Sequence, residues 1–198
     1  KAHAVVANAG CANACTGEQG DKDAHRMQCL AAEALGCKEK EVIVGSTGVI
    51  GVTLPMDKIE TGIKMAIGEL SAEGSVNAGN AIITTDTYSK ACAVSAKIGG
   101  REVRFGAIAK GSGMIRPNMA TMLAFLTTDA AIDQKLLQKA LSEVVEKTFN
   151  MISVDGDMST NDMAIVLANG EAGNVKIEEE GADYEAFKAV LHDVCRGL

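Results

Sequence analysis

Tryptophan is absent from this 198-residue chain, and aromatic residues of all kinds make up only 3% of it. The core of one large or two small domains must therefore be built from Ala, Val, Ile, Leu and Met. Proline is also scarce, with 2 residues against 21 glycines. This balance is typical of a compact protein with many tight turns, not of a disordered one.

The sequence also lacks any run of Lys and Arg, and its formal net charge is −7. Surfaces that bind nucleic acid or anionic membranes usually carry a basic patch, so both kinds of partner are disfavoured. No apolar run approaches the ~20 residues of a membrane span. We expect no signal peptide before the cysteines. We expect a soluble, cytoplasmic protein.

Metal-binding patterns are incomplete. Of the six cysteines, Cys11 and Cys15 have i, i+4 spacing, but no second pair follows to complete a zinc site, so reduced and mostly buried thiols are expected. The polar stretch 155–162 could begin a calcium loop, but Thr160 stands where an EF-hand needs Gly and Val166 where it needs Glu. A self-capped turn is the preferred interpretation of this stretch, and a role in a functional site stays open. We expect no metal and no cofactor.

Histidine chemistry is poorly supported, because the three histidines stand apart in the sequence and none belongs to a known catalytic motif. Those within predicted helices, His25 and His192, are expected to be surface or half-buried residues. The sequence does not support phosphate binding either. Gly106 and Gly111 have Walker A spacing, but Lys110 precedes the second glycine instead of following it.

Strand and helix patterns alternate and predict an α/β or α+β layered fold. Gly99-Gly100 is a strong hairpin signal between expected strands at 91–98 and 101–109. Gly36 is expected to end a helix over 21–35, and Asp133 to cap a later one. Further strands are expected at 4–8, 41–44, 81–85, 121–128 and 163–168, further helices from Pro55 to Leu70 and over 183–195, a Gly-rich turn at 45–51 and a loop at 71–80.

The stretch 110–123, Lys-Gly-Ser-Gly-Met-Ile-Arg-Pro-Asn-Met-Ala-Thr-Met-Leu, joins a Gly-rich loop to an apolar run. Pro117 constrains the backbone before it and blocks a helix. A Thr hydroxyl becomes a useful nucleophile when a base lies beside it, and the α-amine of an N-terminal Thr is one such base. Thr121 would acquire that amine if the Ala120–Thr121 bond were cut. An ordinary Thr at the start of a strand is the alternative.

This stretch closely resembles the self-processing junction of the ornithine acetyltransferase family, the glutamate N-acetyltransferases of arginine biosynthesis. The resemblance covers essentially the whole chain. It extends to the segments 8–17 (Asn-Ala-Gly-Cys-Ala-Asn-Ala-Cys-Thr-Gly), 46–51 (Ser-Thr-Gly-Val-Ile-Gly), 83–87 (Ile-Thr-Thr-Asp-Thr) and 155–162 (Asp-Gly-Asp-Met-Ser-Thr-Asn-Asp), which occur in family order. It implies a layered α/β/β/α fold with mixed sheets and flanking helices. It also implies that family members extend beyond this chain at both ends.

The resemblance implies a role for each matching residue. Thr121 would be the nucleophile and, after cleavage at Ala120–Thr121, the first residue of a β chain. Residues 1–120 would then be the C-terminal part of the α chain and 121–198 the N-terminal part of the β chain, in one intertwined unit. Thr47 and Gly48 match the pair that forms the oxyanion hole. The substrate-binding positions would be Thr84, Lys110 and Thr121.

The implied reaction moves an acetyl group from N-acetylornithine to glutamate, and use of acetyl-CoA as a second donor stays open. The implied assembly is a heterotetramer of two α and two β chains. Two other interpretations compete with this one. A self-processing amidase or aminopeptidase would pass the acyl group to water, and a non-catalytic module would only bind a small molecule.

Overall fold

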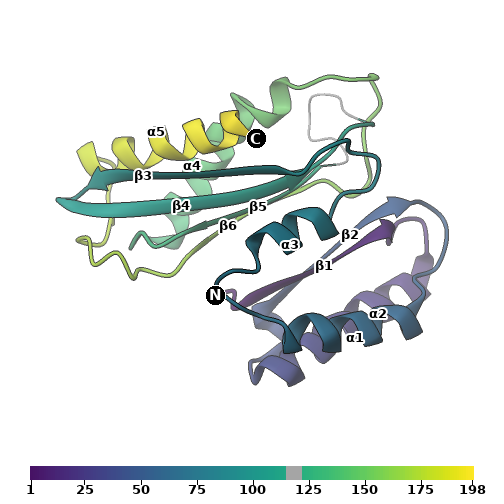
Figure 1. The fold of residues 1–198 in the computed structure, drawn as a ribbon. Coiled ribbons are helices and arrows are strands. Elements are labelled where there is room, and N and C mark those ends of the chain that lie inside the picture. Colours follow the sequence, from purple (N-terminus) through teal and green to yellow (C-terminus); the bar gives the residue numbers. More distant parts are fainter. Residues whose placement is uncertain (115–121) are drawn as a thin grey trace. The chain divides into compact units, whose positions relative to one another are not determined.

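The computed structural model describes residues 1–114 and 122–198 of the chain. They form two compact units, 1–86 and 87–198, and each has its own sheet. The first unit holds β1 (Ala4–Cys11), α1 (Gly17–Leu35), the 3-10 turn η1 (Glu39–Glu41), β2 (Val42–Val49), α2 (Met56–Gly68) and α3 (Ser75–Ala81) (Figure 1). The second holds β3 (Lys90–Ile98), β4 (Arg101–Lys110), β5 (Leu123–Thr128), α4 (Gln134–Glu146), the 3-10 turn η2 (Phe149–Met151), β6 (Met163–Ala168) and α5 (Ala182–Gly197).

In the first unit, β1 and β2 pair in parallel, so the chain must cross over between them, and α1 makes this crossing. Met27 and Leu30 of α1 pack with Val42 of β2 and Ile63 of α2 in a buried apolar cluster. The predicted C-cap is confirmed, because Gly36 adopts φ 67° and its amide donates to the carbonyl of Glu33. Ala and aliphatic side chains build this core without any aromatic residue, as the composition predicts.

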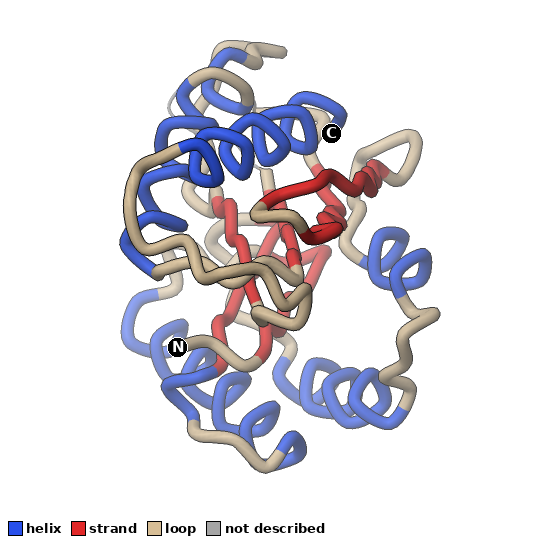
Figure 2. Tube along the Cα trace, turned by 90° about the vertical axis from the view of Figure 1, so that its left-hand side faces the viewer, coloured by secondary structure: helices blue, strands red, loops and turns tan. Residues whose placement is uncertain are grey.

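The second unit has a four-stranded mixed sheet in the order β3-β4-β5-β6, with only the β5–β6 pair parallel. The Gly99-Gly100 hairpin is confirmed, with φ 56° and 76° at its two glycines. Helices α4 and α5 pack on the sheet through a core that includes Phe105 and Phe187. In the turned view of Figure 2, the helix that ends at the C-terminus lies alongside the strands. Asp133 caps α4 as predicted, accepting from the amide of Lys135 at 2.8 Å.

Several predicted boundaries are wrong, and each has a local reason. The expected turn at 45–51 is mostly strand, because β1 supplies backbone partners along β2 as far as Val49. The expected strand at 81–85 does not form. Ala81 instead ends α3, a helix inside the segment predicted as loop. Helix α2 ends at Gly68 and not at Leu70 as predicted, and the Leu70 side chain is 68% exposed.

Two sheets with flanking helices confirm the predicted mixed α/β class. Among the described residues, no helix combines the length and apolarity needed to cross a membrane. The boundary at 86/87 separates two compactly folded units of one chain. The predicted boundary at 120/121 is a different kind of division, a cut in the polypeptide, and it stays a prediction.

Tyr184 offers a stability test inside the second core. Its side chain is fully buried, and its hydroxyl has no hydrogen-bond partner among the described residues. A buried hydroxyl without a partner carries a desolvation cost, so Tyr184→Phe should raise the free energy of unfolding by about 1 kcal/mol. Urea unfolding measures the change. Tyr88→Phe is the matched control, because Tyr88 is 66% exposed and should show no change. A Tyr184→Phe protein less stable than wild type would contradict the prediction.

Candidate active site

In the first unit, two of the family-like segments lie side by side. The register of β1 against β2 places Asn8 opposite Ser46, Ala9 opposite Thr47 and Gly10 opposite Gly48. The pairing continues past the strand, where the amide of Ala12 donates to the carbonyl of Val49 at 2.9 Å. Residues 8–12 of the first segment and 46–49 of the second therefore form one double-stranded edge (Figure 1).

Gly48 is the tightest point of this edge. Its φ of 131° is rarely adopted by residues with a side chain. A Cβ atom at this position would lie 2.6 Å from the amide nitrogen of Cys11 and closer still to the Gly10 carbonyl. Thr47, its neighbour, is fully buried. The backbone at Thr47 and Gly48 is thus held against the first strand by contacts that only glycine permits.

Thr84 lies in the same unit, in the irregular segment between α3 and β3, and its side chain is exposed. The failure of the predicted strand at 81–85 leaves this residue on a loop. Loops commonly carry binding residues because their polar groups face solvent. Its predicted substrate contact is neither supported nor opposed by this placement.

In the second unit, Lys110 is the last residue of β4 and is only 2% exposed. A buried Lys is rare in proteins unless it is paired with other groups. The register places Lys110 opposite Leu123, the first residue of β5. The predicted nucleophile Thr121 lies two positions before Leu123. Thr121 and Ala120 are outside the described residues.

The acidic segment 155–162 makes hydrogen bonds on both sides of that junction. The Asp155 carboxylate accepts from the amide of Met114 at 2.5 Å, and the Asp162 carboxylate accepts from the amide of Met122 at 2.9 Å. The carbonyl of Met122 also accepts from the amide of Met163 at 2.9 Å. Met122 directly follows Thr121, so the backbone one residue beyond the predicted nucleophile is fixed by two hydrogen bonds.

Asp162 is unusual electrostatically. Burial raises its pKa to about 6, against the lowering effects of the Met122 amide and the nearby Lys110 ammonium. Strongly shifted carboxyl groups are more frequent in functional sites than elsewhere. The segment is therefore more than the self-capped turn that the sequence favoured, although Asp155 also accepts from the amide of Asp157 at 3.3 Å as such a turn requires.

A pH test follows from this shift. An Asp whose folded-state pKa is raised binds its proton more tightly when folded, so between pH 3.8 and about pH 6 its contribution to stability falls as pH rises. Asp162→Asn keeps the oxygen that accepts from Met122 and removes the charge. The variant should gain stability relative to wild type as pH rises from 4 to 7, measured by urea unfolding at each pH. A difference that is constant with pH would contradict the shift.

Sequence reasoning missed Asp155 and Asp162 as members of the site. Their partners, Met114 and Met122, are about 40 residues earlier in the chain, so no local pattern reports the contact. The available signal was the excess of Asp, Ser and Asn directly before the strand predicted at 163–168. Polar side chains at a strand end frequently face a site.

These features define a mixed α/β protein with two polar strand-end sites, one built on a glycine contact between β1 and β2 and one on a buried Lys and a half-buried Asp beside a strand junction. The ArgJ family model matches residues 1–198. The chain belongs to the ArgJ family.

The arginine biosynthesis bifunctional protein ArgJ of Symbiobacterium thermophilum is 59% identical over 188 residues, which are 95% of this chain and 47% of the relative. The protein of the same name from Caldanaerobacter subterraneus is 52% identical over 198 residues, 100% of this chain and 49% of the relative. A crystal structure of ArgJ from Bacillus halodurans aligns at TM-score 0.54 and 45% identity, over 59% of this chain and 61% of that one. The chain spans about half the length of the curated relatives it matches.

Proposed function

We propose that the protein is an acyltransferase of arginine biosynthesis that moves an acetyl group from N-acetylornithine to glutamate through an acetyl-Thr121 intermediate. Family membership and the relatives' name, arginine biosynthesis bifunctional protein, support the pathway. The observation that carries the proposal for this chain is the pair of hydrogen bonds that the Asp155 and Asp162 carboxylates accept from backbone amides on either side of the 115–121 segment. A catalytic Thr needs its flanking backbone held in place, because positioning contributes much of the rate.

The first step is self-cleavage. The Thr121 hydroxyl attacks the carbonyl carbon of Ala120, and the Thr121 nitrogen leaves as an amine, which converts the amide to an ester. Water then hydrolyses the ester, giving a carboxylate at Ala120 and a free α-amine on Thr121. This amine is the general base for the next reaction, with an ordinary pKa of about 7.7–8.0 that suits proton transfer near neutral pH.

The second step is acetyl transfer. The Thr121 amine takes the hydroxyl proton, the oxygen attacks the acetyl carbonyl of N-acetylornithine, and ornithine leaves after its nitrogen receives that proton. The amine of glutamate then attacks the acetyl ester, releases N-acetylglutamate and restores the Thr121 hydroxyl. Neither a metal nor an organic cofactor takes part in this scheme. Acetyl-CoA as an alternative donor would give the second activity, amino-acid N-acetyltransferase.

The remaining residues have supporting roles in the proposal. Thr47 and Gly48 form the oxyanion hole, where the hydroxyl and a backbone N–H each stabilise the developing charge by a few kcal/mol. The close contact between Gly48 and the first strand favours this role, because preorganised donors need no rearrangement during the reaction. Lys110 and Thr84 bind substrate, with the Lys110 ammonium suited to a carboxylate group. The functional assembly is two α and two β chains in the cytoplasm.

Incubating the full protein with N-acetylornithine and then digesting it should give a Thr121 peptide heavier by one acetyl group. Adding glutamate should remove the acetyl group and form N-acetylglutamate. Loss of the acetyl group to water at the same rate without glutamate would favour a hydrolase. An unmodified Thr121 peptide would contradict the covalent mechanism. Repeating the incubation with acetyl-CoA as the donor tests the second activity, amino-acid N-acetyltransferase.

A further inference from the structure

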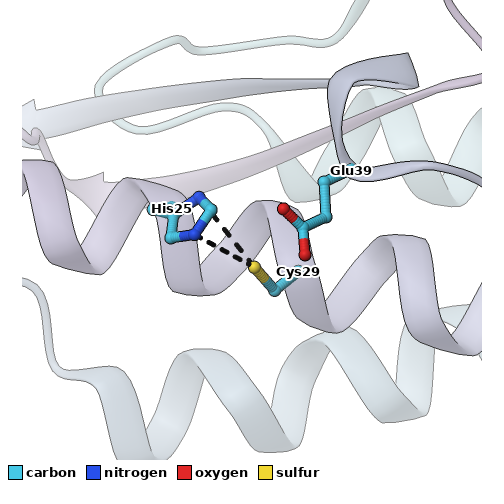
Figure 3. Close-up of side chains that lie close together, drawn as sticks. All are labelled: His25, Cys29 and Glu39. Atoms are coloured by element: carbon cyan, nitrogen blue, oxygen red, sulfur yellow. Dashed lines mark hydrogen bonds between the residues drawn. The ribbon is translucent and has the colours of Figure 1, made fainter.

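Three side chains of metal-ligating types, none of them proposed for catalysis, gather on the first unit. His25 and Cys29 are one turn apart on α1, and the Cys29 sulfur is 3.5 Å from Nε2 of His25. Glu39 of η1 completes the group, and one ligand atom from each residue lies within 4.8 Å of the others. In Figure 3 the sulfur lies between the imidazole and the carboxylate. Among the described residues, His25, Cys29 and Glu39 are the three side chains close enough together to hold one metal ion.

We propose that His25, Cys29 and Glu39 bind a Zn²⁺ ion, with water in the fourth position. A thiolate, an imidazole and a carboxylate are ligand types that zinc accepts together. Metal–ligand lengths of about 2.3 Å for sulfur and 2.0–2.1 Å for nitrogen place the two atoms about 3.5 Å apart at a tetrahedral angle. The observed separation of the Cys29 sulfur and the His25 nitrogen is 3.5 Å. The helix therefore presents the two ligand atoms at the spacing that zinc requires. The sulfur also lies 3.9 Å from Nδ1, so the imidazole must turn for Nε2 to point at the ion.

The third ligand needs a small movement. An oxygen on tetrahedral zinc lies about 3.3–3.6 Å from the other ligand atoms, so the Glu39 carboxylate would move by about 1 Å from the observed arrangement. Glu39 and His25 are exposed, and Cys29 is half-buried. An exposed Glu has the rotamer freedom for this shift. The open side of the group gives a metal ion a path from solvent.

The charges around the thiol also favour a cation. Partial burial raises the pKa of the Cys29 thiol, and the hydrogen bond and negative charge of Glu39 raise it further. The thiolate and the carboxylate together would repel each other unless a positive ion lies between them. Arg26 is a nearby cation whose charge lowers the pKa of that thiol, and its guanidinium donates to Glu60 at 2.9 Å. A bound Zn²⁺ would displace the thiol proton and join the two anionic ligands.

Such an ion would have a structural effect on this unit. It would connect α1 to η1, and η1 leads directly into β2, the strand that carries Thr47 and Gly48. None of these three residues takes part in the proposed acetyl transfer, which needs no metal. The sequence did not reveal it, because His25 and Cys29 alone form no zinc motif and Glu39 follows ten positions later.

Cobalt titration of the full chain tests the proposal, because Co²⁺ replaces Zn²⁺ and reports its geometry. We expect one equivalent of Co²⁺ with an intense tetrahedral spectrum and a thiolate charge-transfer band, both lost when Zn²⁺ is added. Cys29→Ser should abolish the band, and His25→Gln and Glu39→Gln should each weaken Zn²⁺ binding at least about tenfold. Zn²⁺ should also raise the melting temperature of wild type but not of Cys29→Ser.

The matched control is Cys37→Ser, another half-buried free cysteine near the end of the same helix. It should keep the cobalt band and the Zn²⁺ affinity of wild type. The proposal is overturned if wild type gives only the weak spectrum of octahedral cobalt. It is also overturned if Cys29→Ser keeps the band while Cys37→Ser loses it. Because the readouts are spectra and binding, failure of the acetyl-transfer proposal would leave this result unaffected.

Discussion

Replacing Thr121 by Ala in the full protein is expected to leave the Ala120–Thr121 bond intact and to lower acetyl transfer at least about 1,000-fold. The variant removes the hydroxyl that attacks the Ala120 carbonyl. It also prevents formation of the α-amine that serves as base. Intact mass spectrometry reports the cleavage as two chains or one, and release of ornithine from N-acetylornithine reports the transfer. Both losses should occur together, because one oxygen performs both reactions.

Thr121→Ser is the control for this substitution. It keeps a hydroxyl and, once cleaved, an N-terminal amine, so it should split at the same bond and retain measurable transfer. Two chains from Thr121→Ala, divided between residues 120 and 121, would refute self-cleavage by this hydroxyl. A Thr121→Ala protein that stays uncut but transfers acetyl at the wild-type rate would refute Thr121 as the acetyl carrier.

Gly48→Ala, which adds a single carbon atom, should destabilise the first unit strongly and much more than Gly51→Ala. The added Cβ would overlap the backbone of Gly10 and Cys11, and φ 131° is itself unfavourable for Ala. Strain of this backbone type costs about 1–3 kcal/mol, and the clash adds to it. We expect a loss of at least about 3 kcal/mol in the free energy of unfolding. For a chain of this size the melting temperature should fall by about 10 °C.

Gly51→Ala separates the clash from the backbone strain. Gly51 also has positive φ, at 81°, but a Cβ there would meet no atom within 4 Å. Its loss should be confined to about 1 kcal/mol, the cost of the dihedral alone. Equal melting temperatures for the two variants would show that Gly48 does not touch β1 in solution. Calorimetry of both proteins in the same buffer makes the comparison.

Local signals in the sequence predicted much of the fold. Gly99-Gly100 specifies its hairpin through two positive φ angles, and Gly36 and Asp133 mark helix ends through groups within a few residues. Errors arose where the structure of a segment depends on pairing with residues far away in the sequence. Gly45 and Gly48 resemble turn residues, but pairing with β1 extends the strand through them. Helix α3 was missed because Ser, Asn and Gly are weak helix formers whose signal resembles that of a loop.

The candidate site was predictable only in part for the same reason. Resemblance selected Thr47, Gly48, Thr84, Lys110 and Thr121, and the structure places the first two on the contact between β1 and β2 and Lys110 in a buried position. The polar stretch 155–162 left a site role open for Asp162, but its raised pKa was not predictable, because it comes from burial that only the folded chain creates.

The pairing of β4 with β5 determines how the protein would refold after the proposed cleavage. Six residue pairs join Phe105–Lys110 to the strand Leu123–Thr128, and the proposed cut falls in the connection between them. Scission would therefore leave one continuous sheet made of two polypeptides. Such a sheet keeps its shape without the peptide bond, but once denatured its halves must find each other by diffusion. Recovery of the processed enzyme would become second order in protein, while the uncut precursor would recover at a rate independent of concentration.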